Sequence, residues 1–136
     1  MARILVVDDE KSILEMLRYT LEAQGYLVIT AETGAKALSW IKEVKLDLAI
    51  IDLGLPDMNG LEICREIKEN SRTRAIPIII LTGNATNEAK IKGNLEVSAD
   101  LFLNKPIENA DLNKAVATIL EQAEKKHMLL RNKFRK

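Results

Sequence analysis

The chain has 136 residues, 47% of them hydrophobic and 29% charged, and its 20 Lys/Arg residues balance its 20 Asp/Glu residues. This length and composition predict one globular domain with a full hydrophobic core, and they exclude a disordered chain. A single cysteine excludes an internal disulfide, and no apolar run approaches the roughly 18 residues of a membrane helix. Because the first residues are also unlike a secretory signal, we expect a cytoplasmic protein without a membrane span.

Strand and helix patterns alternate through the first half of the chain. Residues 4–7 form a short apolar run that is typical of a strand buried on both faces. Leu14, Leu17 and Leu21 then recur at helical spacing, and Gly25 follows as a stop. We expect, in chain order, a strand at 4–7, a helix at 12–24, a strand at 26–30, a helix at 35–44 and a strand at 48–51.

The same alternation continues through the second half. Residues 78–81 are another apolar, β-branched run, and the apolar residues from Leu112 to Ile119 keep helical register. We expect a helix at 61–68, a strand at 78–81, a weaker helix at 87–97, a short strand at 101–103 and a final helix at 111–123.

Five strands separated by four helices, with a fifth helix after the last strand, predict an α/β fold with a parallel sheet that is covered on both faces. Asp8-Asp9-Glu10 follows the first strand in place of a glycine-rich dinucleotide fingerprint, which argues against a nucleotide-binding Rossmann domain. We therefore expect a doubly wound, flavodoxin-like sheet with strand order 2-1-3-4-5.

Polar residues stand just past the predicted strands: Asp8 and Asp9 after the first, Asp52 after the third, Thr82 after the fourth and Lys105 after the fifth. The carboxyl ends of parallel strands share one edge, so the three carboxylates would converge there. Two like charges about 4 Å apart cost about 4 kcal/mol at an effective dielectric near 20, and Mg²⁺ relieves such repulsion. A metal beside a carboxylate, a hydroxyl and an ammonium is a combination suited to phosphoryl transfer. In such a reaction an aspartate can carry the phosphoryl group. Taken singly, each residue has an ordinary alternative as a helix cap, a turn-former, a strand-end hydroxyl or a loop lysine.

Four segments resemble the response-regulator receiver family, namely RILVVDDE (3–10), DLAIIDLGLPDMNG (47–60), IPIIILTG (76–83) and ADLFLNKP (99–106). The resemblance extends over about residues 2–122. It implies the flavodoxin-like receiver fold and a role in phosphorelay signalling.

The resemblance also implies residue roles. Asp52 would be the phosphoacceptor, and Lys105 would pair with a phosphoryl oxygen. Asp9 would bind Mg²⁺ directly and Asp8 directly or through water, together with Asp52 and the backbone carbonyl of Gly54.

A conformational switch is implied as well. Thr82 would move to donate a hydrogen bond to the phosphoryl group, and Phe102 would turn inward to fill the space left. Inverting a 1:99 equilibrium requires about 5.5 kcal/mol, which a few charge-assisted hydrogen bonds can supply. The alternative for Phe102 is an ordinary core aromatic. The Lys105–Pro106 peptide bond would be cis.

Several positions depart from the family's usual pattern. Ser98 stands where Gly is usual, Leu101 where a second acid is common, and Ile107 where Phe is frequent. These changes weaken any expectation of dimerisation like that of the DNA-binding winged-helix subfamily, although a homodimer remains possible. Gly54 and Asn84 occupy positions that tune the lifetime of the phosphoryl group in this family.

The last 13 residues differ in charge from the rest. Residues 1–123 hold 14 Lys/Arg and 19 Asp/Glu, whereas residues 124–136 hold 6 and 1. We divide the chain into a receiver domain (1–123) and a basic helical extension or linker stub (124–136). His127 and Leu130 continue the helical spacing, so the last helix would project toward a partner or would fray. The basic charge would serve an acidic partner or nucleic acid, or would simply be solvated.

Three functions compete at this point. The first is a receiver that is phosphorylated by a sensor histidine kinase or histidine phosphotransfer protein and controls an output domain or protein, without turnover of an external substrate and without direct nucleic-acid binding. The second is a Mg²⁺-dependent phosphohydrolase of the haloacid dehalogenase type, which would need an acid at the position of Gly54. The third is a binding module that works without phosphorylation, against which the intact set of polar residues argues.

Overall fold

The computed structural model describes residues 1–83 and 99–133. Five parallel strands form one sheet in the order β2-β1-β3-β4-β5, which confirms the predicted topology. The strands are β1 (Arg3–Val7), β2 (Leu27–Ala31), β3 (Leu48–Asp52), β4 (Ile78–Thr82) and β5 (Leu101–Asn104). Every residue of β3 and β4 is buried, whereas β2 and β5 are only partly covered, as expected for central and edge strands.

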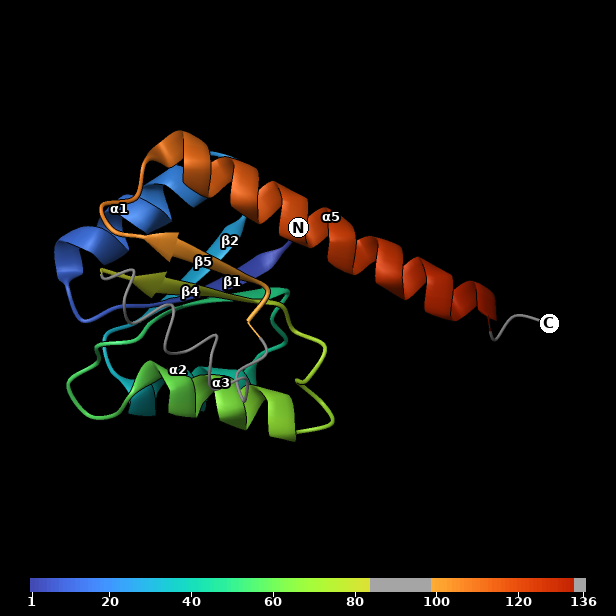
Figure 1. Cartoon of the computed structure of the whole chain (residues 1–136), viewed down its shortest axis with the longest axis horizontal. Helices are drawn as coiled ribbons and strands as arrows, with labels where there is room; N and C mark the ends of the chain where they lie inside the picture. Colours follow the sequence, from blue (N-terminus) through green and yellow to red (C-terminus); the bar gives the residue numbers. More distant parts are fainter. Residues whose placement is uncertain (84–98, 134–136) are drawn as a thin grey trace.

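Helices cover both faces of the sheet (Figure 1). Within the described ranges there are four helices rather than the five predicted, and the helix expected at 87–97 lies outside the described residues. The helices are α1 (Lys11–Glu22), α2 (Gly34–Glu43), α3 (Gly60–Glu69) and α5 (Asn109–Lys133). In Figure 1, α2 and α3 lie on one side of the sheet and α1 and α5 on the other.

Alternation along each strand divides the core into two layers. Leu5 and Val7 of β1 point toward α2 and α3, whereas Ile4 and Val6 point toward α1 and α5. The same alternation in β3 and β4 explains why their sequences are apolar without interruption: both faces are covered. These strands therefore hold the residues that follow them on a rigid base.

Local signals set the helix ends. Thr33 caps α2 by accepting a hydrogen bond from the Lys36 N–H at 3.1 Å, and Asn59 caps α3 by accepting from Leu61 at 3.0 Å. Gly25, beyond the end of α1, has φ 91°, a left-handed conformation that favours glycine.

The last helix is longer than the segment expected at 111–123. It continues without a break to Lys133 and projects beyond the sheet (Figure 1), so of the two alternatives for residues past 123, projection and fraying, the described residues show projection. Leu112, Ala115, Val116 and Ile119 are buried, whereas residues 124–133 are all exposed. Packing against the sheet therefore supports only the first half of α5, and strong helix formers such as Glu, Lys, Leu and Met continue it.

Candidate functional site

The predicted site residues lie at the carboxyl edge of the sheet, on neighbouring strands. Asp8 follows β1, Asp52 ends β3, Thr82 ends β4 and Lys105 follows β5. Asp8 is fully buried, and Asp52 and Thr82 are 7% and 3% exposed. Burial of such polar groups is costly unless they are paired, so their partners define the site.

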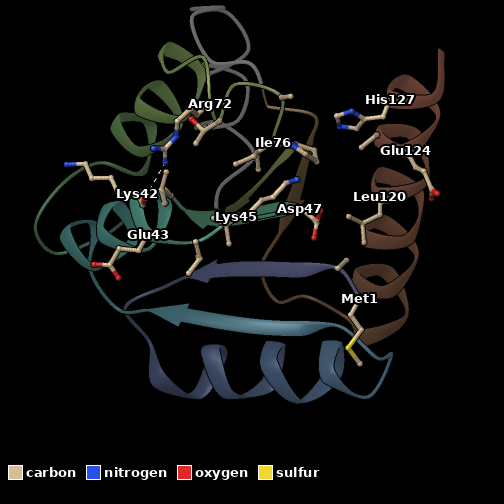
Figure 2. A pocket seen from close by; sticks show the side chains of 18 of the residues that line it. Met1, Lys42, Glu43, Lys45, Asp47, Arg72, Ile76, Leu120, Glu124 and His127 are labelled. Carbon is tan, nitrogen blue, oxygen red and sulfur yellow. Dashed lines mark hydrogen bonds between the residues drawn. The ribbon is translucent and has the colours of Figure 1, made fainter. Parts of the chain in front are cut away.

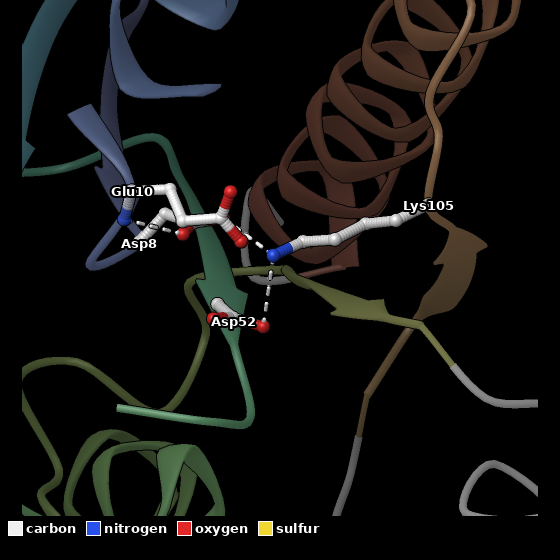
Figure 3. Close-up of polar contacts among 4 residues, drawn as sticks. All are labelled: Asp8, Glu10, Asp52 and Lys105. Carbon is white, nitrogen blue, oxygen red and sulfur yellow. Dashed lines mark hydrogen bonds and ion pairs between the residues drawn. The ribbon is translucent and has the colours of Figure 1, made fainter. Parts of the chain in front are cut away.

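One ammonium group joins two of the carboxylates. Lys105 Nζ lies 2.8 Å from Asp8 Oδ2 and 3.4 Å from Asp52 Oδ1 (Figure 3). The second oxygen of Asp8 accepts a hydrogen bond from the Glu10 backbone N–H at 3.0 Å. The Lys105 side chain reaches across β4 from β5 and is 17% exposed, so one largely enclosed cation lies between two buried anions.

The charges of this cluster shift its titration. Burial raises the pKa of the Asp52 carboxyl, and the negative charge of Asp8 raises it further, while Lys105 and a hydrogen bond from the Gly54 backbone oppose the rise. For Lys105, burial lowers the pKa, but the hydrogen bond with Asp8 and the charges of Asp52 and Asp8 outweigh burial, so the pKa is raised. The two carboxylates thus favour the charged form of Lys105. For Asp52, the contact with Lys105 does not fully offset burial and the negative charge of Asp8.

A group of acids stands beside this pair. Asp8, Asp9 and Glu10 can each present a carboxylate oxygen within 4.8 Å of the others, and Asp9 and Glu10 are exposed. Asp52 is not part of this group but is linked to Asp8 through Lys105. Hard carboxylate oxygens at this spacing fit Mg²⁺, which keeps several waters and binds through few protein ligands. The predicted ligand set does not include Glu10, although its place directly after the acidic pair is a signal.

The segment between Asp52 and α3 is tightly folded. Gly54 and Asn59 form an isolated antiparallel bridge, and the Gly60 N–H donates to the Leu53 carbonyl at 3.0 Å. A side chain at Gly60 would overlap the Asp52 carbonyl oxygen, so this position requires glycine. The fold thereby holds the Gly54 backbone next to Asp52.

The predicted switch residues belong to β4 and β5. The Thr82 carbonyl accepts a hydrogen bond from the Lys105 backbone N–H at 2.8 Å. Phe102 pairs with Ile80 in the sheet and packs, partly buried, against the core layer on the side of α2 and α3. This packing suits both an ordinary core aromatic and a switch, so the switch role stays a prediction. The Lys105–Pro106 peptide bond is cis, the isomer that the resemblance implied.

A separate cleft of about 1050 Å³ lies at the opposite edge of the sheet. Figure 2 shows it between α5 and the loops before β3 and β4, with Lys45, Asp47 and Ile76 on one wall and Glu124 and His127 on the other. None of the predicted site residues lines this cleft. The cleft and the predicted site are therefore separate features at opposite edges of the sheet.

In the part of the chain that the structure describes, no helix combines the length and apolar character needed to cross a bilayer.

Comparison with known proteins gives a consistent result. Residues 4–117 match the family described as response regulator receiver domain. The chain is 39% identical over 122 residues to the alkaline phosphatase synthesis transcriptional regulatory protein PhoP of Bacillus subtilis, covering 90% of this chain and 50% of that protein. It is 39% identical over 119 residues to the phosphate regulon transcriptional regulatory protein PhoB of Pseudomonas aeruginosa, covering 88% and 52%. The chain thus spans about half the length of these curated relatives.

Solved structures superpose on most of the chain. A CheY-like response regulator receiver domain protein from Methanospirillum hungatei superposes with a TM-score of 0.85 at 32% identity, covering 93% of this chain and 98% of that one. The response regulator TrrA of Thermotoga maritima, solved in complex with Mg(2+)-BeF, gives a TM-score of 0.78 at 34% identity, covering 88% and 99%. With the family match and the strand order in agreement, the chain belongs to the response regulator receiver domains, the signalling domains of two-component systems.

Proposed function

We propose that this chain accepts a phosphoryl group on Asp52, in the presence of Mg²⁺, from the phosphohistidine of a sensor histidine kinase or a histidine phosphotransfer protein. The observation that carries the proposal is the bridge from Lys105 to both Asp8 and Asp52 at 2.8 and 3.4 Å. It gathers a nucleophilic carboxylate, a metal-binding carboxylate and a phosphate-binding cation at the edge where ligands of parallel sheets bind.

In the transfer, an Asp52 oxygen attacks the phosphorus, the P–O bond forms and the P–N bond to the imidazole breaks. The electron pair of that bond returns to the imidazole nitrogen. Asp8, Asp9 and the Gly54 carbonyl, with Asp52 itself, would hold Mg²⁺, and Glu10 is close enough to contribute. Mg²⁺ supplies neutralisation of the negative charge that gathers during phosphoryl transfer. Lys105 would exchange its contact with Asp52 for a phosphoryl oxygen, as a mobile point charge can.

The phosphoryl group then changes the conformation. It adds negative charge and acceptor oxygens next to the end of β4, where the Thr82 hydroxyl would donate to one of them. Phe102, which packs beside β4, would move into the space that Thr82 leaves. The population shift would be passed to a downstream output domain or partner protein.

Two relatives are named as transcriptional regulators and others as DNA-binding response regulators. Because this chain spans about half of such proteins, an output that binds DNA would lie in a further domain, and the receiver itself would make no direct contact with nucleic acid. We place the chain in the cytoplasm, with residues 1–123 as the receiver and 124–136 as a basic extension, and we regard a homodimer as compatible with it.

Intact mass spectrometry tests the proposal. The protein is incubated with acetyl phosphate, with and without Mg²⁺, beside Asp52→Asn and the matched control Asp47→Asn, which changes an aspartate at the opposite edge of the sheet. We expect one phosphoryl group on the wild type and on Asp47→Asn, only with Mg²⁺, and none on Asp52→Asn. Equal labelling of Asp52→Asn, or no labelling of the folded wild type by either acetyl phosphate or a cognate kinase, would overturn it.

A further inference from the structure

We propose that Asp57 is a positioning residue that fixes residues 53–59 against α2 and thereby sets the Mg²⁺ affinity of the site. The inference rests on the proposed function, because it concerns the metal that Asp52 and the Gly54 carbonyl would share. Asp57 itself touches neither Asp52 nor the acidic group in the hydrogen bonds and ion pairs of the described residues.

Both carboxylate oxygens of Asp57 bind the start of α2, and we call this pair of hydrogen bonds the clamp. Asp57 Oδ1 accepts from the Gly34 N–H at 2.8 Å, and Oδ2 accepts from the Ala35 N–H at 3.0 Å. These two N–H groups open α2, and the first turn of α2 has no acidic residue of its own. An anion at this place satisfies donors that the helix cannot satisfy internally and meets the positive end of the helix dipole. The two hydrogen bonds, that from Gly34 first, hold the pKa of Asp57 below its ordinary value, as expected for a carboxylate that is bound in its charged form.

Neighbouring contacts make the clamp stiff. The Met58 side chain lies so close to Gly34 that a Cβ there would overlap it. The Gly54–Asn59 bridge closes the segment on itself. The hydrogen bonds of Asp57 therefore join the closed loop at 53–59 to α2, which begins 23 residues earlier in the chain.

The clamp matters because of what the loop carries. Gly54 lies three positions before Asp57 in the same closed segment, and its backbone is near enough to the Asp52 carboxyl to lower the pKa of that group. A loop held in place presents the Gly54 carbonyl without first losing conformational freedom, whereas a loose loop loses that freedom when Mg²⁺ binds. Groups hydrogen-bonded directly to metal ligands typically change metal affinity by roughly 10–100-fold, and Asp57, which acts through the loop, should fall at the low end of that range.

The experiment compares Asp57→Ala with Thr33→Ala. Both variants remove a cap from the start of α2, since Thr33 accepts from Lys36, but only Asp57→Ala releases the loop. Mg²⁺ is titrated into each protein while the NMR amide signals of Leu53 and Gly54 are followed, and hydrogen exchange of residues 53–59 is measured without metal. Phosphorylation by acetyl phosphate is then measured at low and at saturating Mg²⁺.

We expect half-saturating Mg²⁺ to rise about tenfold in Asp57→Ala, with faster exchange of the loop amides. Asp57→Asn, which keeps one acceptor oxygen, should fall between it and the wild type. Thr33→Ala should lower the melting temperature similarly and leave Mg²⁺ binding unchanged. Saturating Mg²⁺ should restore the phosphorylation rate of Asp57→Ala.

Equal Mg²⁺ affinity in Asp57→Ala and the wild type would overturn the inference, as would an equal loss in Thr33→Ala, which would reduce Asp57 to a helix cap. Failure of the proposed function looks different: the wild type would bind Mg²⁺ but remain unphosphorylated, and the Mg²⁺ titrations would still decide the role of Asp57.

Discussion

At the amino edge of the sheet, each of two aspartates makes two hydrogen bonds with the backbone of the first residue of a neighbouring strand. Asp47 donates its N–H to the Arg3 carbonyl and accepts the Arg3 N–H, and Asp100 makes the same two bonds with Ile78, all at 2.8 Å. At the carboxyl edge, by contrast, Asp8 and Asp52 share one ammonium group. The first arrangement satisfies carboxylates with fixed backbone donors and stabilises the fold. The second keeps like charges close together in a buried place, a feature associated with functional sites, and it fits the Mg²⁺ and phosphoryl binding that we propose.

The largest effect should follow from removing the shared cation. Lys105→Ala leaves two buried carboxylates facing each other, and loss of one partner from a buried ion pair costs about 3–5 kcal/mol. Because Lys105 is partly exposed, we expect a decrease of about 2–3 kcal/mol in the free energy of unfolding, measured by urea denaturation at neutral pH.

The control is Lys125→Ala, which removes an exposed ion pair with Glu121 and should change stability by less than about 0.5 kcal/mol. Adding Asp52→Asn to Lys105→Ala should recover part of the loss. If the double variant were less stable than Lys105→Ala alone, repulsion between the carboxylates would not be the cause.

A substitution at the amino edge should lower stability and leave phosphorylation unchanged. Asp100→Ala removes a charged acceptor from the Ile78 N–H and should lower the free energy of unfolding by about 1.5 kcal/mol. Mass spectrometry after incubation with acetyl phosphate and Mg²⁺ should still find one phosphoryl group. A folded Asp100→Ala protein that cannot be phosphorylated would mean that the two edges are coupled.

Asp52→Asn should act in the opposite direction and raise stability by about 1 kcal/mol at neutral pH, because it removes a buried charge next to Asp8. The sign of the pH dependence follows from the raised pKa of Asp52. The cost of its charge is present above the folded-state pKa and is lost as pH falls through that pKa, so the advantage of Asp52→Asn should shrink in acid. Thermal melts of both proteins between neutral and acidic pH check this, and an advantage that grows in acid would contradict it.

The smallest effect should come from ending the chain after Ala123. Glu124, His127 and Arg131 line the cleft beside Asp47, but residues 124–133 are all exposed. Removal of exposed residues should change the free energy of unfolding by less than about 0.5 kcal/mol, with loss of helical signal in circular dichroism. A larger decrease would show that the amino edge depends on this extension as well as on its aspartate pairs.

How far the sequence predicted this structure depends on the range of the interactions. Strand order and the gathering of Asp8, Asp52, Thr82 and Lys105 were predictable, because apolar runs identify parallel strands and such strands share one carboxyl edge. The bond from Asp57 to the start of α2 was not, because nothing local marks an acceptor 23 residues away from its donors.

Two further differences have local causes. Glu10 is absent from the predicted ligand set because the resemblance singles out the two acids before it, yet the turn after β1 brings all three carboxylates together. The sequence also left open whether the last helix projects past residue 123 or frays, because helical spacing at His127 and Leu130 does not show whether anything packs there. The helix projects, with residues of good helix propensity continuing it beyond the part that packs on the sheet.

The unbroken α5 has a mechanical consequence. Its ten residues from Glu124 to Lys133 make a rod about 15 Å long, continuous with the turns that Leu112, Val116 and Ile119 fix to the sheet. Because the helix is continuous, a rotation of its packed first half also rotates the exposed second half. Any change in the seating of α5 beside β5 would therefore reach Lys133 as a displacement that grows with distance from the domain.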